Sequence, residues 1–152
     1  MDDRNPRSTA KILGHPIHPM LVPFPIGFLV GALLSDVGYW LTRDAFFATA
    51  TLYLLAAALV FAALAALAGF TDFFGDKRVR DLSAARRHMV GNLSAVILAL
   101  VNFVLRLGNA EAAVLPTGLI LSAIVALILV YTGWQGGELV FRHRVGVADE
   151  RP

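Results

Sequence analysis

Cysteine is absent from the sequence, and only 16% of its 152 residues are charged. The first absence excludes disulfides, thiolate metal sites and cysteine nucleophiles. The scarcity of charge excludes an ordinary soluble domain, in which about a quarter of the residues are charged. The chain also lacks a phosphate-binding loop and a dinucleotide-binding glycine motif, and Ser83 and Ser94 lack the context of a nucleophile elbow. No catalytic motif is therefore recognised.

Long apolar blocks take the place of these features. Hydrophobic residues make up 57% of the chain, and a transmembrane helix needs roughly 20 of them to cross about 30 Å of hydrocarbon. We expect such helices at about residues 20–41, 46–70, 83–107 and 114–141. Because the links after the first and third helices are short, consecutive helices should be antiparallel neighbours. The predicted fold class is an all-α membrane protein, an antiparallel bundle of four transmembrane helices.

The chain divides into three regions. Residues 1–19 form an N-terminal segment with the motif "HPIHP", residues 20–141 form the bundle, and residues 142–152 form a tail. The polar N-terminus does not read as a cleavable signal peptide. Proline disrupts a helix interior, so the regular first helix is expected to begin around Pro25, after an irregular stretch or a short separate turn. The two halves share a hairpin layout but no convincing sequence repeat.

Basic residues are concentrated on one side of the predicted bundle. Four crossings place the N-terminus, the loop of residues 71–87 and the tail together, and this side holds 11 of the 13 basic residues. They are Arg4, Arg7, Lys11, Lys77, Arg78, Arg80, Arg86, Arg87, Arg142, Arg144 and Arg151. By the positive-inside rule this side is cytoplasmic. Topology therefore accounts for the basic composition, and we expect a lipid bilayer as partner and no nucleic acid.

All four histidines lie on the same side as these basic residues. His15 and His18 precede the first helix, His88 opens the third, and His143 lies in the tail, where an interfacial role is expected. The third helix carries an inward-facing stripe, because its polar and small residues recur at spacings of four and three. This stripe comprises His88, Asn92, Ala95, Ala99, Asn102 and Arg106.

One interpretation of these histidines is a haem b site for electron transfer between partner proteins. His18 and His88 would be the axial ligands, with His15 as the alternative to His18. Arg86 and Arg87 would bind the haem propionates. Asn92 and Asp72 would orient the imidazoles.

Two other interpretations remain open. A divalent metal, with or without ion handling, suits the ligand set of His15, His18, His88 and Asp72. Alternatively, the protein is a structural or assembly subunit without a cofactor, in which the same residues tie loops to helices.

Two features within the apolar helices predict packing. Asp36 and Arg106 lie at similar depth near the end opposite the basic side, and we expect them to form an ion pair, because an intramembrane charge needs a partner. Small residues at every fourth position form seams that allow close helix contact and offer a route to a homo-oligomer. These seams are Gly27, Gly31 and Ser35 in the first helix, and Gly118, Ser122 and Ala126 in the fourth, which are followed by Gly133 and Gly137.

Four stretches together resemble a bacterial membrane family catalogued as domain of unknown function 2231. They are "GHPIHPMLVPFPIG", "AGFTDF", "RRHMVGN" and "GWQGGELVFRHRVGV", and they cover nearly the whole chain. The recurring features of the family fall on His15, Pro16, His18, Pro19, Pro25, Asp36, Asp72, His88, Asn92, Arg106, Gly136, Gly137, Gly146 and Val147. The resemblance implies a bacterial cytoplasmic membrane protein. Because some relatives join such a bundle to Rieske or cytochrome c domains, it also favours electron transfer. Pro23 departs from the pattern, since a polar residue is expected there.

Overall fold

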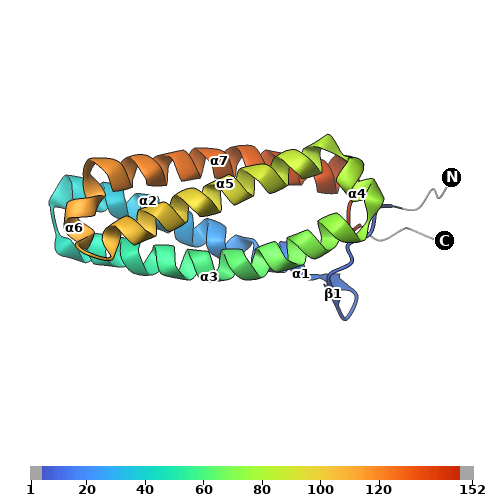
Figure 1. The fold of residues 1–152 in the computed structure, drawn as a ribbon, viewed down its shortest axis with the longest axis horizontal. Coiled ribbons are helices and arrows are strands. Elements are labelled where there is room, and N and C mark those ends of the chain that lie inside the picture. The colour runs from blue at the N-terminus through green and yellow to red at the C-terminus, as the bar shows by residue number, and fades with distance from the viewer. Residues whose placement is uncertain (1–4, 148–152) are drawn as a thin grey trace.

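The fold is an elongated bundle of four long helices, seen in a computed structural model that describes residues 5–147 (Figure 1). Arg4 and Arg151 of the predicted basic side lie outside the described residues. The long helices are α2 (Pro23–Thr42), α3 (Ala45–Gly75), α5 (Ser83–Arg106) and α7 (Leu119–Gly137). With their extensions they form four helices that are long and apolar enough to cross a membrane. The predicted fold class, an all-α four-helix membrane bundle, is therefore confirmed.

Local sequence signals end the helices and turn the chain at the end opposite the basic side. Arg43 ends α2 in the left-handed region at φ 60°, and the Asp44 side chain then accepts a hydrogen bond from the backbone N–H of Phe46. In the second hairpin, Asn109 caps the short helix α6 (Ala110–Ala113) in the same way. A kink, η1 (Val114–Gly118), leads from α6 into α7.

The first helix begins close to the expected position. Two short strands, β1 (Lys11–Ile12) and β2 (His15–Pro16), are followed by the separate turn α1 (Ile17–Leu21). Regular helix then starts at Pro23, two residues before the expected Pro25. Proline is favoured in the first helical turn because the backbone N–H that it lacks has no partner there.

Helix α5 matches its predicted range within one residue, whereas α3 ends later than predicted. Helix α3 continues to Gly75, past the predicted end near residue 70, because "FTDFF" contains no residue that breaks a helix. The short helix α4 (Lys77–Asp81) then links α3 to α5. A wide final turn, η2 (Glu138–Arg142), extends α7 to the end of the fourth span.

The helices pack as two antiparallel hairpins. Helix α2 packs most extensively on α3, and α5 on α7, while α2 also contacts α7 and α3 contacts α5. Helices α2 and α5 therefore lie diagonally opposite each other. The centre is built largely from small side chains, which let the backbones approach closely. The buried residues of this core are Leu29, Ala32, Leu55, Ala58, Ala95, Ala99 and Val125.

The predicted glycine seams face inward only in part, because Gly27 and Gly133 are exposed with open space beside them. Gly31 packs against Leu54, and Gly118 packs against Arg106, with both contacts inside the chain. Because Gly118 and Ser122 are buried between helices, this part of the seam is not available to a second copy. Large apolar side chains cover the outer surface instead, as expected of a surface in contact with lipid.

Candidate functional site

A buried polar cluster joins the two hairpins near the end opposite the histidines. Arg106 Nη2 lies 2.9 Å from Asp36 Oδ2, and both side chains are fully buried. This is the pairing that the sequence predicts. Ser122 Oγ also donates to Asp36 Oδ2 at 2.7 Å, and Thr51 Oγ1 donates to Asp36 Oδ1 at 3.0 Å. Each helix of the bundle thus supplies one of these four side chains.

Arg106 is held from its own helix and from α7 as well. Its Nε donates to Asn102 Oδ1 at 3.0 Å, and Asn102 Nδ2 donates in turn to Ser122 Oγ at 2.9 Å. A Cβ at Gly118 would collide with the guanidinium group and with the Ala113 carbonyl. Glycine is therefore required at position 118 by close approach, and the cluster acts as a latch between the hairpins.

His18 and His88 meet at the other end of the bundle. Their ring centroids are 6.2 Å apart and the ring planes are nearly perpendicular, at 85°. His18 Nδ1 lies 2.8 Å from the carbonyl oxygen of Ala65, and His88 Nδ1 lies 2.8 Å from that of Thr132. Among the described residues, Nε2 of neither ring has a hydrogen-bond partner.

A glycine accommodates each of these imidazole rings. A Cβ at Gly69 would lie 3.0 Å from the His18 ring, and one at Gly136 would lie 3.1 Å from the His88 ring. Gly69 lies four residues after Ala65, and Gly136 lies four residues after Thr132. Each glycine thus comes one helical turn after the residue whose carbonyl contacts the ring. The two histidines therefore rest on their neighbouring helices in the same way.

This likeness extends through both hairpins. Adding 70 to an inward position of the first helix gives in most cases the corresponding inward position of the third, and adding 67 relates the second helix to the fourth. Ser35 is an exception, because its counterpart Leu105 is exposed. In the first and third helices the pairs are His18 and His88, Pro25 and Ala95, Leu29 and Ala99, Ala32 and Asn102, and Asp36 and Arg106. In the second and fourth they include Thr51 and Gly118, Leu55 and Ser122, Ala65 and Thr132, and Gly69 and Gly136. The halves are thus structural counterparts, which their sequences did not reveal.

The predicted metal site is not assembled. His15 is exposed on β2. Asp72 accepts hydrogen bonds from the backbone N–H groups of Thr9 and Ala10, each at 2.7 Å, and from Ser8 Oγ. Within residues 5–147, no group of three or more histidine, aspartate or glutamate side chains is placed to hold a metal ion. The structure therefore does not bring the four predicted ligands together, and the N-terminal segment occupies the Asp72 carboxylate.

Asn92 and Asp72, which were predicted to orient the imidazoles, have other hydrogen-bond partners. Asn92 Nδ2 donates to the backbone carbonyl of His88, and Asn92 Oδ1 accepts from Thr132 Oγ1, so Asn92 ties α5 to α7. Asp72, as described, holds the N-terminal segment. Backbone carbonyls orient the rings instead. Arg86 and Arg87 are exposed on α5, on sides of the helix that do not carry His88.

Sequence reasoning missed the two carbonyl contacts and Gly69, as well as Gln135, which is 8% exposed. Its Oε1 has no hydrogen-bond partner in the described part of the chain. Gln135 immediately precedes the glycine beside His88. His18 precedes Asp36 by 18 residues, and His88 precedes Arg106 by the same number. This repeated spacing is the sequence signal that could have paired the two histidines.

A carboxylate outside the spans organises the loop at the histidine end. The Arg78 side chain donates to Asp76 at 2.8 Å, and Arg7 N–H also donates to it. The hydrogen bond from Arg78 lowers the pKa of Asp76 from 3.8 to about 2, with smaller help from the Arg7 backbone. The carboxylate is therefore charged at neutral pH and links α4 to the N-terminal segment.

A family model described as "Predicted membrane protein (DUF2231)" matches residues 14–149. No curated protein matches the chain, and no solved structure matches it.

Proposed function

The chain belongs to the DUF2231 family of predicted membrane proteins, and we propose that it binds haem b through His18 and His88 and carries electrons at the basic end of the bundle. The observation that carries the proposal is the pair of imidazoles from α1 and α5, 6.2 Å apart between ring centroids. A bond from imidazole nitrogen to a metal is about 2 Å long. If both rings bound one metal ion, two such bonds and the two ring radii would give a separation of this size.

The donor set suits haem better than a bare metal ion. A structural zinc ion takes four ligands from the protein, whereas the described residues bring two histidines together. Haem supplies the other four iron ligands from its own ring. When bound, it would provide one-electron redox chemistry.

The chain prepares both imidazoles in the same way. A ring whose Nδ1–H donates to a backbone carbonyl keeps its lone pair on Nε2, and this outer hydrogen bond also fixes the ring orientation. Ala65 and Thr132 supply the carbonyls for His18 and His88. Gln135 adds a buried amide oxygen without a partner beside this region. These features support two ligands held in place before a cofactor arrives.

The test is a reduced-minus-oxidised visible spectrum of the protein purified in mild detergent from haem-replete cells. We expect an α band in the wild type, its loss in His18→Ala and His88→Ala, and its retention in the matched controls His15→Ala and His143→Ala. A flat wild-type spectrum would overturn the proposal. So would a band that survives both ligand substitutions.

Rescue by free imidazole distinguishes a variant that has lost only a haem ligand from one that binds no haem because it misfolds. In His88→Gly, free imidazole can occupy the space of the lost side chain, so added imidazole should restore the α band. Restoration shows that the scaffold is intact and that an imidazole is the missing element. A folded His88→Gly protein that stays colourless with imidazole would argue against His88 as a ligand.

A second function is favoured by the same hydrogen bonds. Because each histidine ties the polar end of one helix to its neighbour, a structural or assembly subunit without a cofactor can use the pair as two staples. Under this function the wild type is colourless, yet His88→Ala lowers its thermal stability. The spectrum and the melting temperature therefore separate the two functions.

We further infer the orientation and partners from charge. The histidine end carries most of the basic residues, and the positive-inside rule places it in the cytoplasm of a bacterium. Electron donors or acceptors would then approach from that side or within the bilayer. Accessibility of a single introduced cysteine to a membrane-impermeant reagent tests the orientation directly, since the natural chain has none.

A further inference from the structure

An exposed apolar tip projects from the basic end of the bundle. Strands β1 and β2 pair Lys11 with Pro16 and Ile12 with His15, and Leu13 and Gly14 form the turn. Ile12 is 61% exposed and Leu13 is 94% exposed. Figure 1 shows this hairpin extending sideways from the bundle beside α1, not along the bundle axis.

The turn places a leucine where a small polar residue is usual. Leu13 has φ 50° and Gly14 has φ 83°, and a turn with two such residues favours asparagine or glycine at both positions. A large apolar side chain in this conformation is disfavoured. Its near-complete exposure means that no contact within the described chain compensates for the cost.

The hairpin is nevertheless held firmly to the bundle. Asp72 on α3 binds the backbone N–H groups of Thr9 and Ala10 directly before it. Directly after it, the Ile17 N–H donates to the Ala10 carbonyl at 2.9 Å. The tip is therefore carried at a fixed height and direction, as an anchoring element requires.

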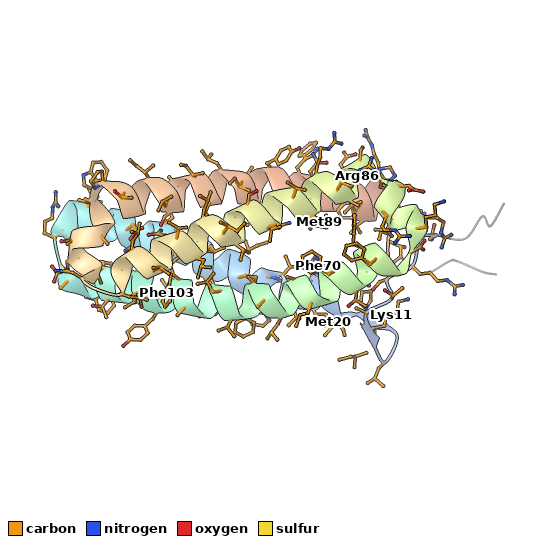
Figure 2. The ribbon with its side chains drawn as sticks, in the orientation of Figure 1. Lys11, Met20, Phe70, Arg86, Met89 and Phe103 are labelled. Carbon is orange, nitrogen blue, oxygen red and sulfur yellow. The ribbon has the colours of Figure 1, made fainter. Side chains whose placement is uncertain are left out.

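The neighbouring surface indicates what covers the tip. The first span begins at Ile17, directly after the hairpin, and Met20 of that span is 62% exposed on the lipid-facing surface. In Figure 2, Lys11 and Met20 lie on the same side of the bundle. Apolar side chains beside a lysine at this depth are typical of membrane interfaces.

We propose that the hairpin of residues 11–16 is an interfacial membrane anchor at the basic end. Ile12 and Leu13 insert into the apolar edge of the leaflet, and Lys11 binds lipid phosphates. The occupant is the lipid surface, because the tip continues the lipid-facing surface and its charge complements anionic headgroups. The anchor sets the depth of the chain directly before His18, but it does not depend on what His18 binds.

The absence of cysteine allows a direct test. Leu13→Cys, labelled with an environment-sensitive fluorophore, is reconstituted in vesicles with and without phosphatidylglycerol. We expect a blue-shifted emission and quenching by shallow spin-labelled lipids several-fold stronger than at the control Asp81→Cys, which is exposed on α4. Replacing Lys11 with glutamine should reduce the effect of phosphatidylglycerol on the quenching.

Two results would overturn the anchor. Emission and quenching at position 13 equal to those of the Asp81→Cys control would mean that the tip lies in water. A blue shift that depends on protein density in the membrane and resists lipid-borne quenchers would mean that a second copy covers it. If Leu13→Cys does not fold, Ile12→Cys carries the same label on the same tip and decides between these outcomes.

Discussion

Removing one charge from the buried latch should lower the free energy of unfolding far more than removing one charge from an exposed ion pair with the same N–O distance. Arg106→Met leaves the Asp36 carboxylate buried, with Ser122 and Thr51 as donors but no countercharge. Breaking one side of a buried pair typically costs about 3–5 kcal/mol. If Arg106 contributed only an interhelical hydrogen bond, the loss would be nearer 0.6 kcal/mol, the average measured between membrane helices.

The exposed counterpart is the Arg142–Glu138 pair. It has the same N–O distance of 2.9 Å, but the arginine side chain is 76% exposed. Pairs of this kind on a helix contribute about 0.3–0.5 kcal/mol, so Arg142→Met should be almost silent. The difference between the two variants isolates the effect of burial.

The assay is reversible unfolding in mixed micelles by added dodecyl sulfate, followed by helical circular dichroism. A double variant, Asp36→Leu with Arg106→Met, removes both charges and should lose much less stability than Arg106→Met alone, because replacing both partners of a buried pair by apolar residues is often neutral. The cycle should therefore show a coupling of at least about 2 kcal/mol. Additive losses would refute the reasoning, because they would mean that the two charges do not depend on each other.

Three further outcomes follow from the site geometry. Gly118→Ala should destabilise the protein by about 1–3 kcal/mol in the same assay, because the added Cβ collides with Arg106. The control Gly27→Ala, whose Cβ would have nothing within 4 Å, should be neutral or slightly stabilising. Asp76→Asn should remove about 1 kcal/mol at neutral pH, allowing for solvent screening. Because the folded pKa of about 2 lies below the ordinary value of 3.8, this contribution is present above about pH 4 and fades as the pH falls toward 2. Melting curves across that range measure the effect. Gly69→Leu should displace the His18 ring and weaken the α band, while the described fold, judged by circular dichroism, remains.

The sequence was sufficient to predict the bundle and its ion pair. Apolar runs of spanning length define helices without reference to tertiary contacts. Asp36 and Arg106 were predictable as partners because charged residues inside such runs are few and need compensation. The extension of α3 to Gly75 was not predictable by the same reasoning, because a span length sets only the minimum length of a helix.

Contacts to the backbone explain most of what sequence reasoning missed. Every residue carries a carbonyl and nearly every residue an N–H group, so nothing in the letters shows that Ala65 and Thr132 hold the histidines, or that Thr9 and Ala10 occupy Asp72. The predicted metal-ligand set is not assembled for this reason, since it counted Asp72 as available. The internal likeness escaped notice because it lies in burial and spacing, while the corresponding residues differ in kind.

The two ends of the bundle use these corresponding positions in opposite ways. At one end the counterparts are Asp36 and Arg106, which have complementary charges and neutralise each other inside the chain. At the other end they are His18 and His88, two identical groups that cannot form an ion pair when neutral and whose Nε2 atoms have no hydrogen-bond partner in the described residues. Complementary residues close a contact, whereas two identical imidazoles at this separation would suit a third group between them. This contrast within one scaffold is why we propose a stabilising role for the latch and a binding role for the histidine pair.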